Sequence, residues 1–411
     1  MTGGDGRDGT WPPNRLAGRM PASLALPAAG HLREGGTPFR HSVWAERLGG
    51  LDPSRGAPSM TSVFLYGTLM HPPHLEALLG RAAETRPAVL DGWRRGRDGA
   101  DARALMTPDP GARVEGLVLE AGPDDLERLT RYAGAHVQAP RRVATQDGAA
   151  VAFVPTEGVA PSGPWSLEEW AGAWGALAVE VAREVRRDDG APIASARRRA
   201  AARLHAGSRG ADRSADVDLV ARRRPYSGFY AFEEYELRHR RFDGGWSPVI
   251  ERGVLVSFDA VIVLPYDPVR DRVLLIEQFR VGRLARGERD PWSVEPVAGL
   301  LDPGETPETC ARREGIEEAG VEMTTLHRAS SGYTSPGAST GYHHHYVGIC
   351  DLPDDAAGLG GLDEEDEDIR GRLMPTGELI DGVSSGALDN SPLILLTLWL
   401  ALNRERLRAA G

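Results

Sequence analysis

The segment that most constrains this 411-residue chain is residues 298–321, AGLLDPGETPETCARREGIEEAGV. Thr306 is a residue type that caps helix N-termini, and Pro307 suits the first helical position because its missing N–H would have no partner there. Gly320 stands where many helices end on a left-handed residue. The sequence therefore predicts a helix over Pro307–Ala319.

Three carboxylates lie on neighbouring parts of one surface of this helix. Glu314 and Glu318 are four residues apart, and Glu317 is three residues beyond Glu314. Such carboxylates repel one another near the negative end of the helix dipole, and a hard cation would relieve that repulsion. The pattern indicates Mg²⁺, with Mn²⁺ as the alternative, although a solvated helix face with i,i+4 charges has the same pattern.

The residues before and within the helix extend this candidate metal site. The backbone carbonyl of Ala298 can supply a further oxygen ligand. Arg313 is placed to pair with a carboxylate and hold its orientation. A metal in this position would take its remaining ligands from a substrate phosphate, which suits cleavage of a diphosphate.

The spacing resembles the signature of the Nudix superfamily, G-x5-E-x7-R-E-U-x-E-E-x-G-U, in which U is a bulky aliphatic residue. The matching residues are Gly299, Glu305, Arg313, Glu314, Glu317, Glu318, Gly320 and Val321. Gly315 departs from the pattern at the first aliphatic position. This glycine costs about 1 kcal/mol of helix stability relative to alanine, but it removes no ligand.

The resemblance is strongest to the ADP-ribose pyrophosphatase branch and covers nearly all of residues 224–406. It is carried by LPYDPVRDRVLLIEQFR (264–280), the signature, TSPG (334–337) and DEEDEDIR (363–370). It implies the Nudix fold, an α+β architecture in which a mixed sheet is sandwiched by helices in α-β-α layers. It also implies Mg²⁺-dependent hydrolysis of ADP-ribose to AMP and ribose 5-phosphate.

The same resemblance assigns roles to individual residues. Metal ligands would be Ala298 through its carbonyl, Glu314, Glu318 and Glu367; catalytic residues Glu365, Glu317 and Arg313; and substrate-binding residues Arg280, Leu300, Ser335, Pro336 and Gly337. Glu365 would be the base that activates water. Composition alone would make residues 363–368 a disordered acidic run. Gly341 replaces a glutamate that many relatives carry, so sugar recognition stays open.

Three consecutive histidines, His343, His344 and His345, resemble a second metal site. Adjacent residues of a strand point to alternating faces, so the three side chains cannot ligate one ion together. The sequence therefore predicts structural histidines.

The N-terminal half resembles a different family. FLYGTL (64–69) is similar to the opening motif of gamma-glutamylcyclotransferase-like (AIG2-like) proteins, and the resemblance extends over residues 62–185. It implies a small, mainly β barrel whose ligand loop contains Tyr66, Gly67, Thr68 and Leu69. The pairing of this domain with a Nudix half resembles tellurite-resistance Nudix proteins.

The catalytic glutamate of that family is missing here. The corresponding triplet reads Tyr132-Ala133-Gly134, and a methyl group cannot transfer a proton. The sequence therefore predicts an N-terminal domain without cyclotransferase activity, unless Glu127 or another carboxylate substitutes.

A chain of 411 residues exceeds what one hydrophobic core usually organises, so we expect two domains. The predicted division is 1–61, a disordered extension or one that precedes a true start at Met60; 62–190, the gamma-glutamylcyclotransferase-like domain; 191–224, a helical linker; and 225–411, the Nudix domain. Two apolar stretches, 254–264 and 273–277, predict a hairpin with its turn at 265–268.

Composition limits the compartment and the partners. A net charge of −11 argues against nucleic acid as a partner, and no apolar stretch is long enough to cross a membrane. Two cysteines are typical of a reducing compartment, so we expect a cytoplasmic protein. The resemblance implies a small-molecule nucleotide sugar as substrate, and a homodimer through the Nudix domain in which residues 226–242 complete the partner's site.

Three other functions stay open. The enzyme could hydrolyse another nucleoside diphosphate sugar or a dinucleotide, for which Gly341 leaves room. A non-catalytic nucleotide sensor would keep the binding site without the chemistry, although a sensor has no need for all of the signature carboxylates. A bifunctional enzyme with an active cyclotransferase half is opposed by Ala133.

Overall fold

The apolar stretch at Val63 forms the central strand of the N-terminal sheet. The structure is a computed structural model, and it describes residues 60–97, 103–134, 136, 138–156, 161–187, 192–361 and 367–410. The sheet has the order β2-β3-β1-β5-β4. Its strands are β1 (Thr61–Leu65), β2 (Thr85–Arg97), β3 (Ala104–Ala121), β4 (Gln138–Thr145) and β5 (Gly148–Pro155). The expectation for residues 1–61 concerns a stretch that, up to residue 59, lies outside the described residues.

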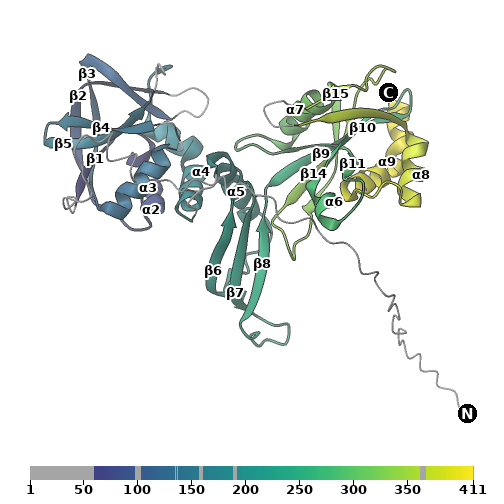
Figure 1. Ribbon diagram of the computed structural model, residues 1–411, viewed down its shortest axis with the longest axis horizontal. Coiled ribbons are helices and arrows are strands. Elements are labelled where there is room, and N and C mark those ends of the chain that lie inside the picture. The colour runs from purple at the N-terminus through teal and green to yellow at the C-terminus, as the bar shows by residue number, and fades with distance from the viewer. Residues whose placement is uncertain are drawn as a thin grey trace, which may run out of the picture. The chain divides into compact units, whose positions relative to one another are not determined.

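The two edges of this sheet approach each other. The N–H of Gln146, just after β4, donates to the carbonyl of Val89 on β2 at 3.2 Å. The sheet therefore curls toward the small, mainly β barrel that the sequence predicts (Figure 1). Phe64, Tyr66 and Val154 belong to the apolar cluster on one face of the sheet.

Helices pack on the other face of the sheet, where Val63 and Leu65 point. They are η1 (Thr68–Met70), α2 (Pro72–Leu79), α3 (Pro123–Gly134), α4 (Leu167–Arg187) and α5 (Ile193–Gly207). Leu129 of α3, Ala182 of α4 and Ala200 of α5 are fully buried in this second cluster. The alternation of β1 side chains between the two clusters follows from the two-residue period of a strand.

A three-stranded sheet, in the order β6-β7-β8, comes next in the chain. It comprises β6 (Val217–Ser227), β7 (Ala231–His239) and β8 (Ile250–Val256), after the short η2 (Ser214–Asp216). The prediction of a helical linker over 191–224 is therefore wrong for residues 217–224. Arg223 pairs with Glu234 and Glu236 across the hairpin, and such cross-strand partners cannot be read from the local sequence.

The C-terminal part is built on an eight-stranded mixed sheet. Its path is β13-β14-β9-β10-β16-β15, with β11 on β10 and β12 on β9, and β14 is parallel to β9. The strands are β9 (Asp259–Asp267), β10 (Arg272–Phe279), β11 (Trp292–Glu295), β12 (Val297–Leu300), β13 (Thr325–Tyr333), β14 (Tyr342–Ile349), β15 (Leu359–Gly360) and β16 (Ile369–Pro375).

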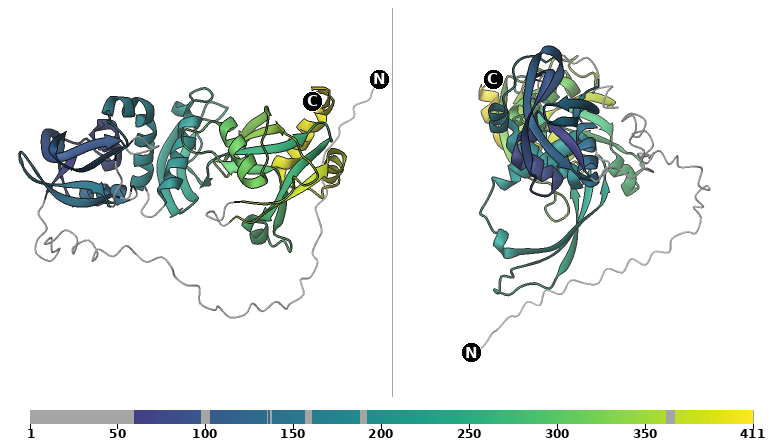
Figure 2. Two further views of the ribbon diagram at one scale, coloured as in Figure 1. Left: turned by 90° about the horizontal axis from the view of Figure 1, so that it is seen from above. Right: turned by 90° about the vertical axis from the view of Figure 1, so that its left-hand side faces the viewer.

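Helices cover both faces of this sheet, which produces the predicted α-β-α layers (Figures 1 and 2). The covering helices are α7 (Pro307–Ala319), α8 (Thr376–Ser385) and α9 (Ser391–Ala410), and the short α6 (Val281–Arg286) follows β10 without buried residues. Val261 and Val263 of β9 pack toward α7, whereas Ile262 and Leu264 pack toward α8 and α9. Every residue of β9 is buried because both faces are covered.

The predicted hairpin is confirmed, with its turn displaced along the chain. β9 and β10 pair antiparallel through Asp267 and Arg272. Pro265 and Tyr266 belong to β9, so the turn is formed by residues 268–271. Asp271 has φ 56°, a left-handed conformation that aspartate tolerates in turns.

The predicted signature helix is confirmed at both ends. α7 begins at Pro307 and ends at Ala319. The Thr306 side chain accepts a hydrogen bond from the N–H of Thr309 at 3.2 Å, and Gly320 is left-handed with φ 65°.

The cysteines and the longest helices bear on the expectations about compartment and membrane. Cys310 and Cys350 are both buried free thiols. Among the helices of the described segments, none is long and apolar enough to cross a membrane.

Candidate metal and substrate site

Two of the predicted metal ligands are buried where α7 lies against β12. Glu314 is 9% exposed to solvent and Glu318 is 3% exposed. Glu318 accepts a hydrogen bond from the N–H of Ala298 at 2.9 Å. A Cβ at Gly299 would lie 1.8 Å from Oε1 of Glu314, so only glycine leaves room for this carboxylate.

The carbonyl of Ala298 is turned toward the same carboxylates. In an antiparallel strand the N–H and C=O of one residue point to the same side. Because the Ala298 N–H donates to Glu318 rather than to β9, its carbonyl also faces α7. Leu300, two residues later, has the same orientation, since its carbonyl accepts from Arg313 at 3.3 Å.

Positive neighbours compensate the charge of the two buried carboxylates only in part. Burial raises the pKa of Glu314 to about 7, and the charges of Glu317 and Glu367 contribute. Burial likewise raises the pKa of Glu318 to about 8, with contributions from Glu314 and Glu367. The charge of Glu367 thus acts on both glutamates, and its assignment as a metal ligand stays a prediction.

This donor set fits a divalent cation. Two buried carboxylates and a backbone carbonyl are hard oxygen ligands, and a cation would offset the charge that burial penalises. Within the described residues no three His, Cys, Asp or Glu side chains already converge on one point. The fit therefore rests on the chemistry and burial of the donors.

Arg313 joins the carboxylates around this site. It donates to Glu314 at 2.6 Å and to Glu317 at 2.8 Å. It also forms two hydrogen bonds with Glu305, at 3.0 and 3.1 Å. Arg313 thus fixes the orientation of several acids at once, and Glu305 anchors Arg313, a role that the spacing alone did not reveal.

Arg280, the predicted diphosphate contact, is held by a residue that the sequence analysis missed. Glu295, at the end of β11, is buried and accepts from Nη2 of Arg280 at 2.8 Å. Burial works against the charged guanidinium, but Glu295, Glu318 and Tyr230 together raise the pKa of Arg280. Arg280 is therefore close to the Glu318 carboxylate. In the sequence, the sign of this role for Glu295 is its place at the end of a short apolar strand.

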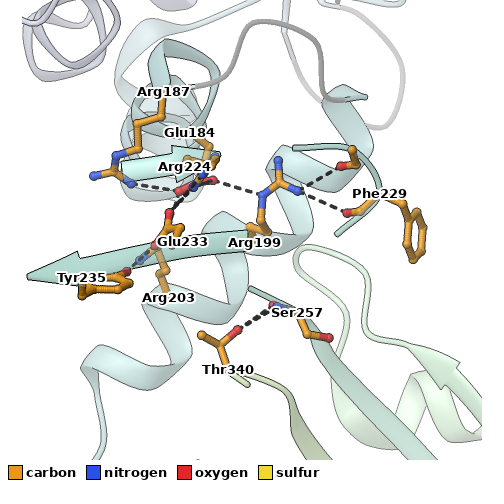
Figure 3. Close-up of polar contacts among 11 residues, drawn as sticks. Glu184, Arg187, Arg199, Arg203, Arg224, Phe229, Glu233, Tyr235, Ser257 and Thr340 are labelled. Carbon is orange, nitrogen blue, oxygen red and sulfur yellow. Dashed lines mark hydrogen bonds and ion pairs between the residues drawn. The ribbon is translucent and has the colours of Figure 1, made fainter. Parts of the chain in front are cut away.

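The predicted substrate residues Ser335, Pro336 and Gly337 lie in an exposed turn. The carbonyl of Ser335 accepts from the N–H of Ser339 at 2.8 Å, which closes the turn. Thr340 accepts from the N–H of Ser257 at 2.9 Å and ties the turn to the segment after β8 (Figure 3). No described contact joins this turn to the α7 carboxylates, so its substrate role stays a prediction.

The segment that precedes the acidic loop lies beside α7. The N–H of Gly361 donates to the carbonyl of Glu317 at 3.3 Å. A Cβ at Gly360 would lie 2.1 Å from the carbonyl oxygen of Glu318. Glu365, the predicted base, lies outside the described residues, whereas Glu367 is described. The assignment of Glu365 stays a prediction.

The three histidines of β14 alternate between faces, as predicted. The rings of His343 and His345 lie 5.7 Å apart on one face. His344 lies on the other face, with Nε2 3.9 Å from Asp259. His345 is buried and hydrogen-bonds Ser330 at 3.1 Å, which is a structural contact.

The predicted ligand loop of the N-terminal part lines a small pocket of about 50 Å³. Its lining includes Tyr66, Gly67, Thr68, Leu69, Arg103, Tyr132, Ala133, His136 and Gln138. Ala133 presents a methyl group to this pocket. Glu127, the possible substitute, is exposed on α3 and is not among the lining residues.

Comparisons with known families and proteins find a separate family match in each half of the chain. The NUDIX domain family matches residues 257–393, and the gamma-glutamyl cyclotransferase, AIG2-like family matches residues 63–167. The ADP-ribose pyrophosphatase of Escherichia coli (strain K12) is 37% identical over 193 residues, which are 47% of this chain and 91% of that protein.

Two further relatives cover the same half. The ADP-ribose pyrophosphatase of Haemophilus influenzae is 34% identical, over 47% of this chain and 89% of that protein. The GDP-mannose pyrophosphatase of Cronobacter sakazakii is 35% identical, over 40% of this chain and 80% of that protein. Similarity to these relatives thus spans about half of this chain and most of each of them.

The burial of His345 predicts a pH dependence of stability. Burial lowers the pKa of His345 to about 4. At a pH below the ordinary histidine pKa, the folded state therefore binds fewer protons than the unfolded state. This contribution is complete above pH 6.5 and is lost as the pH falls toward 4. We expect His345 to account for about 2 kcal/mol of the stability lost between pH 7 and pH 5.

Urea unfolding at both pH values measures this loss. The variant His345→Gln should lose correspondingly less free energy of unfolding on acidification than the wild type. The matched control His239→Gln, at an exposed histidine, should behave as the wild type does. Equal acid sensitivity of all three proteins would contradict the assignment.

Proposed function

This chain belongs to the Nudix family of hydrolases, and on that basis we propose that its C-terminal domain hydrolyses ADP-ribose to AMP and ribose 5-phosphate with Mg²⁺. Its relatives are pyrophosphatases of nucleoside diphosphate sugars. The observation that carries the proposal is the buried pair Glu314 and Glu318 beside the Ala298 carbonyl. The negative charge of this pair is compensated only in part.

In this mechanism each residue has a defined task. Ala298, Glu314, Glu318 and Glu367 would hold the cation, which neutralises charge on the diphosphate oxygens. Arg313 keeps Glu314 and Glu317 in orientation. Arg280, oriented by Glu295, binds the diphosphate. Glu365 accepts the proton of the attacking water, which approaches phosphorus in line with the leaving oxygen.

A second candidate function is hydrolysis of another nucleoside diphosphate sugar. One group of relatives consists of GDP-mannose pyrophosphatases, and Gly341 replaces the glutamate of many ADP-ribose enzymes. Both candidates use the same metal site and differ only in the sugar and base that are recognised.

The first test is turnover by the purified full-length chain with Mg²⁺ and a panel of nucleotide sugars, with products identified by ³¹P NMR. ADP-ribose should be preferred. Glu318→Gln and Glu365→Gln should each lower kcat at least about 100-fold, because they remove a metal ligand and the base.

Glu322→Gln, at an exposed glutamate just beyond α7, is the matched control and should retain activity. Tight nucleotide binding without hydrolysis would reject the enzyme and favour a sensor. Preference for another nucleotide sugar would favour the second candidate.

We also propose that the chain forms a homodimer through the sheet β6-β7-β8. This sheet exposes an unusual set of large apolar side chains: Val217, Leu219, Val220, Tyr226, Phe232 and Leu255. Tyr226, Phe232 and Leu255 are cross-strand neighbours, so their exposed side chains form one apolar row, which is typical of a protein interface. The proposed occupant is the same surface of a second copy, as the resemblance to dimeric relatives implies.

Light scattering after size-exclusion chromatography tests the dimer. The wild type should elute with the mass of two chains, and Leu219→Arg should shift the population to monomer because a buried unpaired charge is costly. Leu402→Arg, at an exposed leucine of α9, should remain dimeric. A wild-type monomer at high concentration would contradict the proposal.

For the N-terminal domain we propose binding or structure without cyclotransferase activity. Ala133 stands at the pocket where the family's proton-transferring glutamate is expected. The domain limits 62–190 and 225–411 also stay a proposal, supported by family matches that fall within them. Helix α5, in the segment between these limits, packs into the N-terminal core and is grouped with the N-terminal domain below.

The full-length chain should release no 5-oxoproline from gamma-glutamyl dipeptides or gamma-glutamylamines in an assay by mass spectrometry. An authentic gamma-glutamylcyclotransferase is the positive control. Release of 5-oxoproline that is abolished by Glu127→Gln would show instead that Glu127 substitutes for the missing base.

A further inference from the structure

Arg199 connects the N-terminal helices to a loop of the following sheet. Its side chain on α5 is buried, with the residue only 1% exposed. Nε donates to Glu184 of α4 at 3.1 Å, and Nη1 donates to the carbonyls of Gly228 and Phe229 at 3.3 and 3.2 Å (Figure 3). One guanidinium thus spans two helices and the loop 228–230 between β6 and β7.

Glu184 does not depend on Arg199 for its charge balance. It also pairs with Arg187, Arg203 and Arg224, at 2.9, 3.1 and 2.9 Å. Burial opposes its ionisation, but Arg203 and Arg224 outweigh that penalty and hold the pKa of Glu184 below its usual value. The distinctive contribution of Arg199 is therefore its pair of bonds to the loop carbonyls.

The helices that carry Arg199 are anchored in the N-terminal core. Ala196 and Ala200, on either side of Arg199 on α5, are buried in the same apolar cluster as Val63 of β1. Val181 and Val185 of α4 belong to this cluster as well. Arg199 therefore projects from a packed support, so the position of the loop carbonyls is set by the N-terminal domain.

The loop 228–230 borders the proposed substrate site. The N–H of Gly228 donates to the carbonyl of Tyr230 at 2.9 Å, which makes the loop a tight turn. Phe229 and Tyr230 both pack on Phe258, with ring centroids 5.2 and 5.4 Å away. The carbonyl of Asp259, the residue after Phe258, accepts from the N–H of Leu301 at 3.0 Å, so the loop packs beside the strand end that carries the predicted substrate residue Leu300.

The same helix pair contacts a second loop of the site. Arg198 of α5 pairs with Asp302 at 3.1 Å. A Cβ at Gly304 would lie 3.4 Å from the ring of Trp174 on α4. Residues 302–304 lead directly into α7. The N-terminal helices therefore touch the segments on two sides of the proposed site.

We propose that Arg199 is a positioning residue through which the N-terminal domain sets the substrate-binding loop 228–230 of the Nudix domain. Without it, the loop carbonyls lose their donor and the loop samples other conformations. Substrate must then order the loop on binding, which raises KM, whereas the carboxylates that determine kcat are untouched. The kinetic part of this inference rests on the proposed function.

The first experiment needs no substrate. Hydrogen–deuterium exchange of the ligand-free, full-length protein is measured for peptides that contain residues 228–232. Arg199→Met should accelerate exchange there about 10-fold or more. The matched control Arg203→Met removes another arginine of the same cluster that bonds Glu184 and Glu233 but not the loop, and it should leave this exchange unchanged. Equal exchange in both variants would overturn the proposal.

The second experiment measures kinetics with the best nucleotide sugar of the panel. Arg199→Met should raise KM about 10-fold, equivalent to about 1.4 kcal/mol, with kcat within about 2-fold of the wild type. Arg199→Lys should be intermediate, because an ammonium cannot reproduce the planar fork. A fall in kcat at constant KM, or the same KM change in Arg203→Met, would overturn the proposal.

The two experiments separate this inference from the proposed function. If no nucleotide sugar is hydrolysed, the proposed function fails, and the exchange measurement alone decides whether Arg199 positions the loop. If Arg199→Met does not fold, Arg199→Lys retains the charge and provides both measurements.

Discussion

Burial of Glu314 and Glu318 between α7 and β12 is the constraint around which the C-terminal domain is arranged. Their ionised forms are disfavoured by burial, and their neighbours compensate only in part. The Ala298 N–H satisfies one carboxylate, Arg313 pairs with the other, and Gly299 is the residue without a side chain that leaves space for it. The charge that remains uncompensated is what makes this place suitable for a divalent cation.

The fold keeps this arrangement rigid. The side chains of β9 alternate between two apolar clusters, so α7 on one side and α9 on the other are pressed against the same strand. β12 pairs with β9 along its whole length, and this register fixes the position of Ala298 along the strand relative to Glu318. A one-residue slip of β12 would turn the Ala298 carbonyl away from α7. The site is therefore specified by strand register as much as by its own residues.

The N-terminal domain has a small pocket lined by Tyr66, Gly67 and Ala133, and in our proposal this pocket lacks a proton-transferring carboxylate. Its helices α4 and α5 meanwhile contact segments of the Nudix domain through Arg198 and Arg199. A domain without cyclotransferase activity can still have a structural task, because packing and ion pairs do not require proton transfer. In our proposal that task is to hold a substrate-binding loop.

Local sequence was sufficient wherever a structure depends on neighbouring residues. The bounds of α7 follow from Thr306, Pro307 and Gly320, and the alternation of the β14 histidines follows from strand geometry. Only the tertiary structure paired Glu295 with Arg280, turned residues 217–224 into a strand, and brought Arg199 to the carbonyls of a loop about thirty residues away. The physical reason is that these contacts join residues distant in sequence, whose partners are chosen by packing and register and leave no local pattern.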